Sequence, residues 1–154
     1  MKQTDNFKFD EANVMNELVY RNLSEDEKRQ ICAWKYGGEY DLYNLPSYEE
    51  MQVRQIGFMN PKSEKNYYGF WDESILVGFV NILEEKEEVF IGIGVNPDLC
   101  NKHYGQRMLL ITYEISKKLY PNKPLYLEVR TWNIRAVKCY QKAGFRIDGQ
   151  AYEL

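Results

Sequence analysis

The sequence predicts an α/β (α+β) fold in which a mixed, mostly antiparallel sheet is flanked by helices. Three strand-like segments, residues 67–71, 75–83 and 89–95, follow one another across short polar turns, which is typical of antiparallel strands. After Val95 the apolar period changes from two residues to about 3.6, and strands then alternate with helices. The length of 154 residues suits one domain. We therefore expect a single domain over residues 1–154, with N-terminal helices in 1–65 and the α/β core in 66–154.

Two helices are expected in the N-terminal half. Ser24 and Glu27 match the capping-box pattern S-x-x-E, which predicts the start of a helix that extends to about Trp34. The glycine pair that follows breaks this helix. A second helix is expected over residues 48–56, after a Pro-Ser pair.

The C-terminal half alternates between the two kinds of element. Pro97 ends the third strand, and a polar loop leads to a helix whose apolar residues recur at helical spacing over residues 108–119. Residues 125–131 predict a buried strand. Asn133 is a preferred N-cap residue and predicts a helix over residues 134–143.

The ends of the chain carry weaker signals. Residues 1–12 are polar and are expected to form a loose arm, and residues 16–21 predict a first strand. Residues 145–147 predict a last strand, which residues 151–154 can extend.

Composition excludes several classes of function. The net charge of −3 gives no overall attraction to nucleic acid. No apolar run approaches the roughly 20 residues of a membrane span, and the first residues lack the apolar core of a signal peptide, so we expect a cytoplasmic protein. Cys100 and His103 have no second ligand pair, so we expect no metal site. One histidine in the chain argues against a Ser-His-Asp mechanism.

The basic residues gather late in the sequence. Two interpretations stay open: a solvated helix face, or a local site for a phosphorylated ligand. The residues are Lys117, Lys118, Lys123, Arg130, Arg135, Lys138, Lys142 and Arg146.

The segment from Val95 to Met108 is a strand–loop–helix junction, which is suited to anions. The first amides of a helix have no intrahelical acceptor and lie at the positive end of the helix dipole. Gly105 permits close approach of a ligand to the backbone. A dinucleotide site is the competing interpretation, but Pro97 occupies the third glycine position of G-x-G-x-x-G.

The same junction carries a resemblance to a known family. The stretch VNPDLCNKHYGQRMLL resembles the acyl-CoA loop of the GNAT superfamily, the acetyl-CoA-dependent N-acetyltransferases. Cys100 stands where Arg or Gln is common, and Asn101 and His103 stand where glycines are common. If those positions need a positive φ, Asn and His tolerate it better than most residues.

A second motif is more specific. The stretch LYLEVRTWNIRAVKCYQKAGF is similar to the family pattern that joins a late strand to the following helix. The two motifs together cover about 60 residues of the 154. The matching positions of the second motif are Val129, Asn133, Ala136, Tyr140, Gly144 and Phe145.

The resemblance implies acetyl-CoA (coenzyme A) as co-substrate and a set of residues that hold it. It implies a backbone amide of residues 93–95 for the acyl oxygen and Tyr140 as the general acid for the leaving thiolate. Glu88 is the candidate general base, with Glu128 or a base acting through water as alternatives. The cofactor-binding residues implied are Ile93, Gly94, Val95, Cys100, Asn101, Lys102, His103, Tyr104, Gly105, Gln106, Arg107, Asn133, Ala136 and Tyr140.

The acceptor side is expected in residues 1–65. Trp34, Tyr36 and Tyr40, with Tyr43 nearby, can line a pocket for an apolar or a cationic amine, the latter through cation–π contact. Glu39 and Asp41 lie among them and can attract an ammonium group. The alternative is that these aromatic residues only pack the core.

These expectations combine into one function. The chain is expected to move an acetyl group from acetyl-CoA to a primary amine of a small molecule or peptide, by direct attack through a tetrahedral intermediate. The alternative is a non-catalytic acyl-CoA sensor or interaction module with a GNAT-like fold. Exposed strand edges make a homodimer reasonable.

Overall fold

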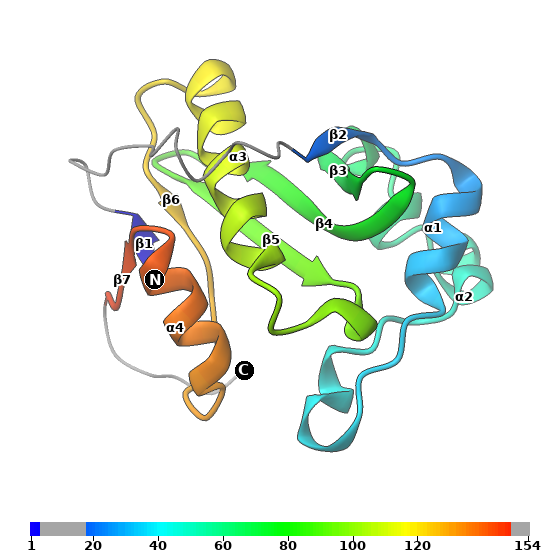
Figure 1. Ribbon diagram of the computed structural model, residues 1–154. Helices are drawn as coiled ribbons and strands as arrows, with labels where there is room; N and C mark the ends of the chain where they lie inside the picture. Colours follow the sequence, from blue (N-terminus) through cyan, green and yellow to red (C-terminus); the bar gives the residue numbers. More distant parts are fainter. Residues whose placement is uncertain (4–17, 149–154) are drawn as a thin grey trace.

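The computed structural model describes residues 1–3 and 18–148, which form a seven-stranded sheet in the order β2-β3-β4-β5-β6-β1-β7 (Figure 1). Neighbouring strands pair antiparallel except β5 and β6, which pair parallel. The expected mixed, mostly antiparallel sheet flanked by helices is confirmed. The strands are β1 (Lys2–Gln3), β2 (Val19–Asn22), β3 (Tyr67–Asp72), β4 (Ile75–Glu84), β5 (Val89–Val95), β6 (Leu125–Tyr126) and β7 (Phe145–Arg146).

The predicted helices form, with small changes at their ends. The capping box is present: the Glu27 amide donates to Ser24 Oγ at 3.3 Å, and the Ser24 amide donates to Glu27 Oε1 at 2.7 Å. Asn133 is the N-cap that the sequence predicts. The α-helices are α1 (Glu25–Cys32), α2 (Tyr48–Arg54), α3 (Tyr104–Leu119) and α4 (Ile134–Lys142), and the 3-10 helices are η2 (Gly38–Tyr43), η3 (Gly57–Met59), η4 (Glu64–Asn66) and η5 (Pro97–Leu99).

Two apolar clusters lie on opposite faces of the sheet. On one face, α3 packs through Met108 and Leu109 against alternate residues of β4 and β5 such as Val80 and Ile91. On the other face, α1 and α2 pack against other residues of β3 and β4, such as Trp71. Figure 1 shows α3 crossing the sheet over β4 and β5, with α1 and α2 together at the right, beside β3 and β4. None of the described helices has the length and apolarity to cross a membrane.

The loose arm expected for residues 1–12 is wrong at its start. Lys2 and Gln3 form β1, which inserts between β6 and β7. The Leu127 amide donates to Met1 O at 2.9 Å. This pairing joins residues more than 120 positions apart, so no local pattern signals it. Residues 4–17 and 149–154, which include parts of the expected first and last strands, lie outside the described residues.

The strand expected over residues 125–131 is wrong in its length, because only Leu125–Tyr126 pair as β6. Their partners on β5 are Val89 and Phe90. Beyond these pairs the two segments diverge, as Figure 1 shows, so residues 127–130 have no strand neighbour on the β5 side. The divergence opens the sheet beside the C-terminal half of β5.

Candidate active site

A cavity of about 650 Å³ lies where β5 and β6 diverge. Its walls come from β4, β5, the segment between α1 and α2, the start of α3 and one face of α4. The residues that line it are Ile31, Trp34, Tyr36, Tyr40, Tyr43, Leu45, Tyr67, Phe79, Asn81, Phe90, Gly92, Ile93, Gly94, Val95, Leu99, Cys100, Asn101, His103, Tyr104, Gly105, Gln106, Asn133, Arg135, Ala136, Lys138, Cys139, Tyr140 and Lys142.

The backbone of β5 presents amides to this cavity. The Val89 amide donates at 2.9 Å to the chain just before β6, and the Asn96 amide donates at 2.8 Å to β4. Because consecutive residues of a strand direct their amides to opposite sides, Ile93 and Val95 direct theirs away from β4 and into the opening. The hydroxyl of Tyr36 donates to the Val95 carbonyl at 2.6 Å, which fits the same direction.

The N-terminus of α3 faces the cavity without a side-chain cap. His103 is the N-cap residue with φ 66° and makes no capping hydrogen bond among the described residues. Asn101 has φ 65°, so both positions adopt the left-handed conformation that Asn and His were expected to tolerate. The amides that follow His103 are therefore left for an anionic ligand.

Gly105 lies in the first turn of α3, at the point where this helix approaches α4. A Cβ atom at this position would lie 3.0 Å from Cys139 Sγ on α4. A side chain there would push α3 and α4 apart, so the glycine serves close helix approach as well as access to the backbone.

The N-terminus of α4 is closed by its own cap. Asn133 Oδ1 accepts from the Ala136 amide at 3.1 Å, and Asn133 Nδ2 donates to the Tyr43 hydroxyl at 3.0 Å. Both ends of the side chain are therefore engaged within the protein. The capping role expected for Asn133 is confirmed.

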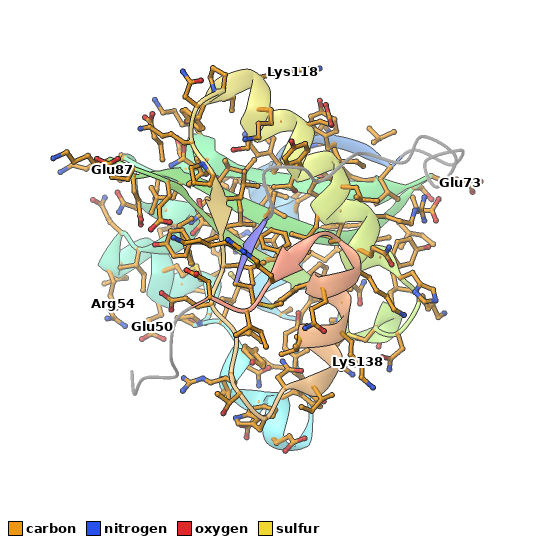
Figure 2. The ribbon with its side chains drawn as sticks, turned by 90° about the vertical axis from the view of Figure 1, so that its left-hand side faces the viewer. Glu50, Arg54, Glu73, Glu87, Lys118 and Lys138 are labelled. Atoms are coloured by element: carbon orange, nitrogen blue, oxygen red, sulfur yellow. The ribbon has the colours of Figure 1, made fainter. Side chains whose placement is uncertain are left out.

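Three basic residues on α4 line the cavity. Arg135, Lys138 and Lys142 are spaced so that they share one face of the helix. Figure 2 shows Lys138 projecting from α4 toward solvent. No Asp or Glu belongs to the described lining, so the formal charge of this wall is positive. A positive wall suits a phosphorylated ligand.

Tyr140 lies on the same helix and packs against the apolar cluster around α3. Burial raises the pKa of its phenol above the ordinary value, and Cys139 and Tyr43 add to the shift. The phenol is therefore held in its protonated form, which is the form a proton donor needs.

The aromatic residues of the η2 region hold this segment against α4. The rings of Tyr40 and Trp132 lie 5.6 Å apart, and the Arg135 guanidinium lies 4.3 Å from the centre of the Tyr40 ring. Trp34 belongs instead to the apolar cluster of α1 and α2. Trp34, Tyr36 and Tyr40 all line the cavity, whereas Glu39 and Asp41 are exposed and do not.

Most of the residues singled out in the sequence meet at this cavity. Twelve of the fourteen expected to hold the cofactor line it, and the two that do not are Lys102 and Arg107. Glu88 does not line it either: its carboxylate lies 3.5 Å from Lys2 Nζ, where β5, β6 and β1 come together. In the described part of the chain, no group of three or more His, Cys, Asp or Glu side chains is placed to hold a metal ion.

Sequence reasoning missed part of the wall. Asn81 and Phe90 line the cavity on the sheet face opposite α3. Neither residue belongs to the two sequence motifs that predicted the site. The available signal was Asn81 itself, a polar residue within the otherwise apolar stretch FVNIL. For the basic residues of α4, the sequence leaves open both a solvated face and a site for a phosphorylated ligand.

Comparisons with known proteins identify the family and similar folds. The acetyltransferase (GNAT) family matches residues 28–145. No curated protein matches the sequence.

Several solved structures share the fold. An acetyltransferase of the GNAT family from Bacillus anthracis has a TM-score of 0.71 at 17% identity, covering 86% of this chain and 81% of that one. A chimera of the spermidine N-acetyltransferase SpeG from Vibrio cholerae and hSSAT has a TM-score of 0.70 at 20% identity, covering 86% and 82%. The Vibrio cholerae spermidine N-acetyltransferase in complex with CoA and spermine has a TM-score of 0.61 at 20% identity, covering 86% and 83%. With its family match extending over most of the sequence, the chain belongs to the GNAT family of acetyltransferases.

Proposed function

We propose that the protein transfers the acetyl group of acetyl-CoA to a primary amine of a small molecule or peptide. The observation that carries the proposal is the convergence, in one cavity, of the β5 amides, the uncapped start of α3 and Tyr140. The phosphates of acetyl-CoA fit the α3 amides and the basic face of α4. The residues present therefore suit this co-substrate.

The β5 backbone stabilises the tetrahedral intermediate. As the amine nitrogen attacks the thioester carbon, the C–N bond forms and the carbonyl oxygen gains negative charge in the tetrahedral intermediate. An amide of Ile93 or Val95, directed into the opening, donates to that oxygen.

Tyr140 completes the transfer. When the C–S bond breaks, the phenol donates a proton to the leaving thiolate. The proton of the attacking nitrogen passes to water, and water returns a proton to the Tyr140 phenolate. Since no carboxylate belongs to the described lining, water replaces the side-chain base that Glu88 was expected to be.

Replacement of Tyr140 tests this assignment. Tyr140→Phe should lower kcat by roughly 10²-fold while leaving the Kd for acetyl-CoA nearly unchanged, because only the proton donor is removed. The measurement is thiol release with acetyl-CoA and a panel of amines, with binding followed by calorimetry. Tyr20→Phe, on β2 and outside the cavity lining, is the matched control and should have the kcat and the Kd of the parent protein.

An unchanged kcat in Tyr140→Phe would remove the acid role. Tight acetyl-CoA binding without turnover of any amine would favour the sensor function instead.

The alkaline side of the pH profile gives a second test. Because burial raises the pKa of Tyr140, the acid stays protonated at pH values where an ordinary tyrosine, with a pKa of about 10, ionises. We expect no loss of kcat from this group between pH 7 and about 10. A fall in kcat near pH 8 that disappears in Tyr140→Phe would contradict the shift.

The assembly state stays a prediction. One of the matching Vibrio cholerae spermidine N-acetyltransferase structures is described as dodecameric. The exposed strand edges expected from the sequence suit a homodimer of this chain, which light scattering of the purified protein would test.

A further inference from the structure

The cavity has two chemically different ends. The end formed by α3 and α4 carries the basic residues and the open helix amides. The other end lies on the sheet face opposite α3 and is walled by aromatic rings. There the Phe79 ring lies 6.4 Å from both the Trp34 and the Tyr67 rings and 5.4 Å from that of Phe58. These mutual contacts make a rigid, apolar wall.

Asn81 interrupts this wall with a polar atom that no described residue satisfies. It lies on β4 directly opposite Gly92 of β5. Its Oδ1 atom is buried and has no hydrogen-bond partner among the described residues. A buried acceptor without a donor destabilises a protein, and native structures seldom leave one. Because rotation about the terminal torsion exchanges the amide oxygen and nitrogen, the oxygen can be turned toward a ligand.

The two glycines of β5 differ in what they face. A Cβ atom on Gly94 would collide with the Phe79 ring, so that glycine is explained by packing alone. A Cβ atom on Gly92 would meet only ordinary contacts, 3.5 Å from the Cβ of Asn81 and 3.8 Å from Phe90. Gly92 therefore leaves open space over the β5 backbone, beside the Asn81 amide. We call this part of the cavity lining the Gly92 floor.

The charge of the cavity selects among amines. No Asp or Glu belongs to the described lining, so no carboxylate at the aromatic end can pair with an ammonium group. An apolar site without a carboxylate disfavours an ammonium group and lowers the pKa of a bound amine. A polyamine would bring two or more charges into a site with no carboxylate to pair them, at a large desolvation cost. The neutral amine, which is the nucleophilic form, is favoured.

We infer that the acceptor is a monoamine with an aromatic or similarly apolar body, bound in neutral form, and that Asn81 positions its nitrogen. The inference rests on the proposed acetyl transfer. The body of the acceptor packs against Phe79 and Trp34 over the Gly92 floor. Its N–H donates to Asn81 Oδ1, which directs the nitrogen lone pair toward the opening beside Ile93 and Val95. Asn81 is a positioning residue, because it takes no part in bond making.

The amine panel of the thiol-release assay tests this inference directly. We expect kcat/KM for phenethylamine to exceed the values for putrescine and spermidine by at least roughly tenfold. Acetyl transfer that prefers spermidine would overturn the inference and leave the proposed function standing. Acetyl-CoA binding without transfer to any amine would overturn both.

Two variants examine the residues that carry the argument. Asn81→Leu should raise KM for phenethylamine roughly fivefold to tenfold, with little change in the Kd for acetyl-CoA. Its melting temperature should not fall, because the change removes an unsatisfied polar atom. Gly92→Val should raise the same KM by filling the floor, in a strand where valine is well tolerated. Asn81→Asp should narrow the preference for phenethylamine over spermidine. Unchanged KM values in Asn81→Leu and Gly92→Val would show that the acceptor does not bind on this face.

Discussion

The two helices that flank the cavity begin in opposite ways. At α4, the side chain of Asn133 caps the Ala136 amide and also holds Tyr43. At α3, His103 stands in a left-handed conformation and caps nothing among the described residues. A capped helix end is satisfied by its own protein, whereas an uncapped end leaves donors for a ligand. The comparison supports the start of α3 as the proposed anion site, whereas the start of α4 anchors the η2 segment.

The largest expected effect comes from placing a negative charge at the open helix end. Gln106 lies in the first turn of α3 and lines the cavity. Gln106→Glu is nearly isosteric and should weaken acetyl-CoA binding by roughly 30-fold, because the carboxylate repels the phosphates and competes for the same amides. Calorimetric titration measures the Kd.

A matched control separates charge at the site from charge in general. Gln52→Glu makes the same change at an exposed position of α2, outside the cavity lining, and should leave the Kd within a factor of about two. Equal affinities for the two variants would show that the phosphates do not bind at the start of α3. High salt should reduce the difference between the variants, since screening weakens the repulsion.

Removal of the cap at α4 should act on stability instead. Asn133→Ala should lower the free energy of unfolding by about 1 kcal/mol, or a melting temperature by roughly 2–4 °C in a domain of this size. Asn133→Asp keeps an oxygen for the Ala136 amide and should recover most of the loss, although it gives up the hydrogen bond to Tyr43. Thermal unfolding followed by circular dichroism measures both. A normal melting temperature combined with weaker acetyl-CoA binding would assign the Asn133 amide to the ligand.

The same comparison shows what the sequence can predict. Local signals located two helix starts: Ser24 caps α1 and Asn133 caps α4, as their chemistry and spacing predict. The tolerance of Asn101 and His103 for positive φ also followed from residue type. These features are short range, so a single sequence contains them.

Long-range pairings were not visible. Nothing near Lys2 indicates that it pairs with Tyr126 and Arg146, and nothing in residues 127–130 indicates that β5 has diverged from them. The same limit affected the site. Glu88 was chosen from its place in a strand, but the added strand β1 supplies Lys2 as its partner. Asn81 was missed because its importance lies in the wall that surrounds it.

The smallest expected effect comes from changing the two left-handed residues of the α3 loop. Gly has no Cβ and adopts positive φ without strain, so Asn101→Gly with His103→Gly should keep the loop conformation. We expect the Kd for acetyl-CoA to stay within about threefold of the parent value, because backbone amides make the site. Stability should change by less than about 1 kcal/mol, since relief of strain is offset by the greater freedom of glycine in the unfolded chain.

A variant at His103 that keeps a Cβ atom is the comparison for the double glycine variant. His103→Ala retains the Cβ penalty at φ 66° and should destabilise the start of α3 by about 1 kcal/mol relative to His103→Gly. If the double glycine variant binds acetyl-CoA normally while Gln106→Glu does not, the open helix end binds through its backbone. A tenfold or greater loss of affinity in the double variant would instead assign binding to the side chains of Asn101 and His103. In that case, the side chains before α3 would bind the ligand, whereas the Asn133 side chain at α4 binds its own protein. The lack of a cap at α3 would then not explain the binding.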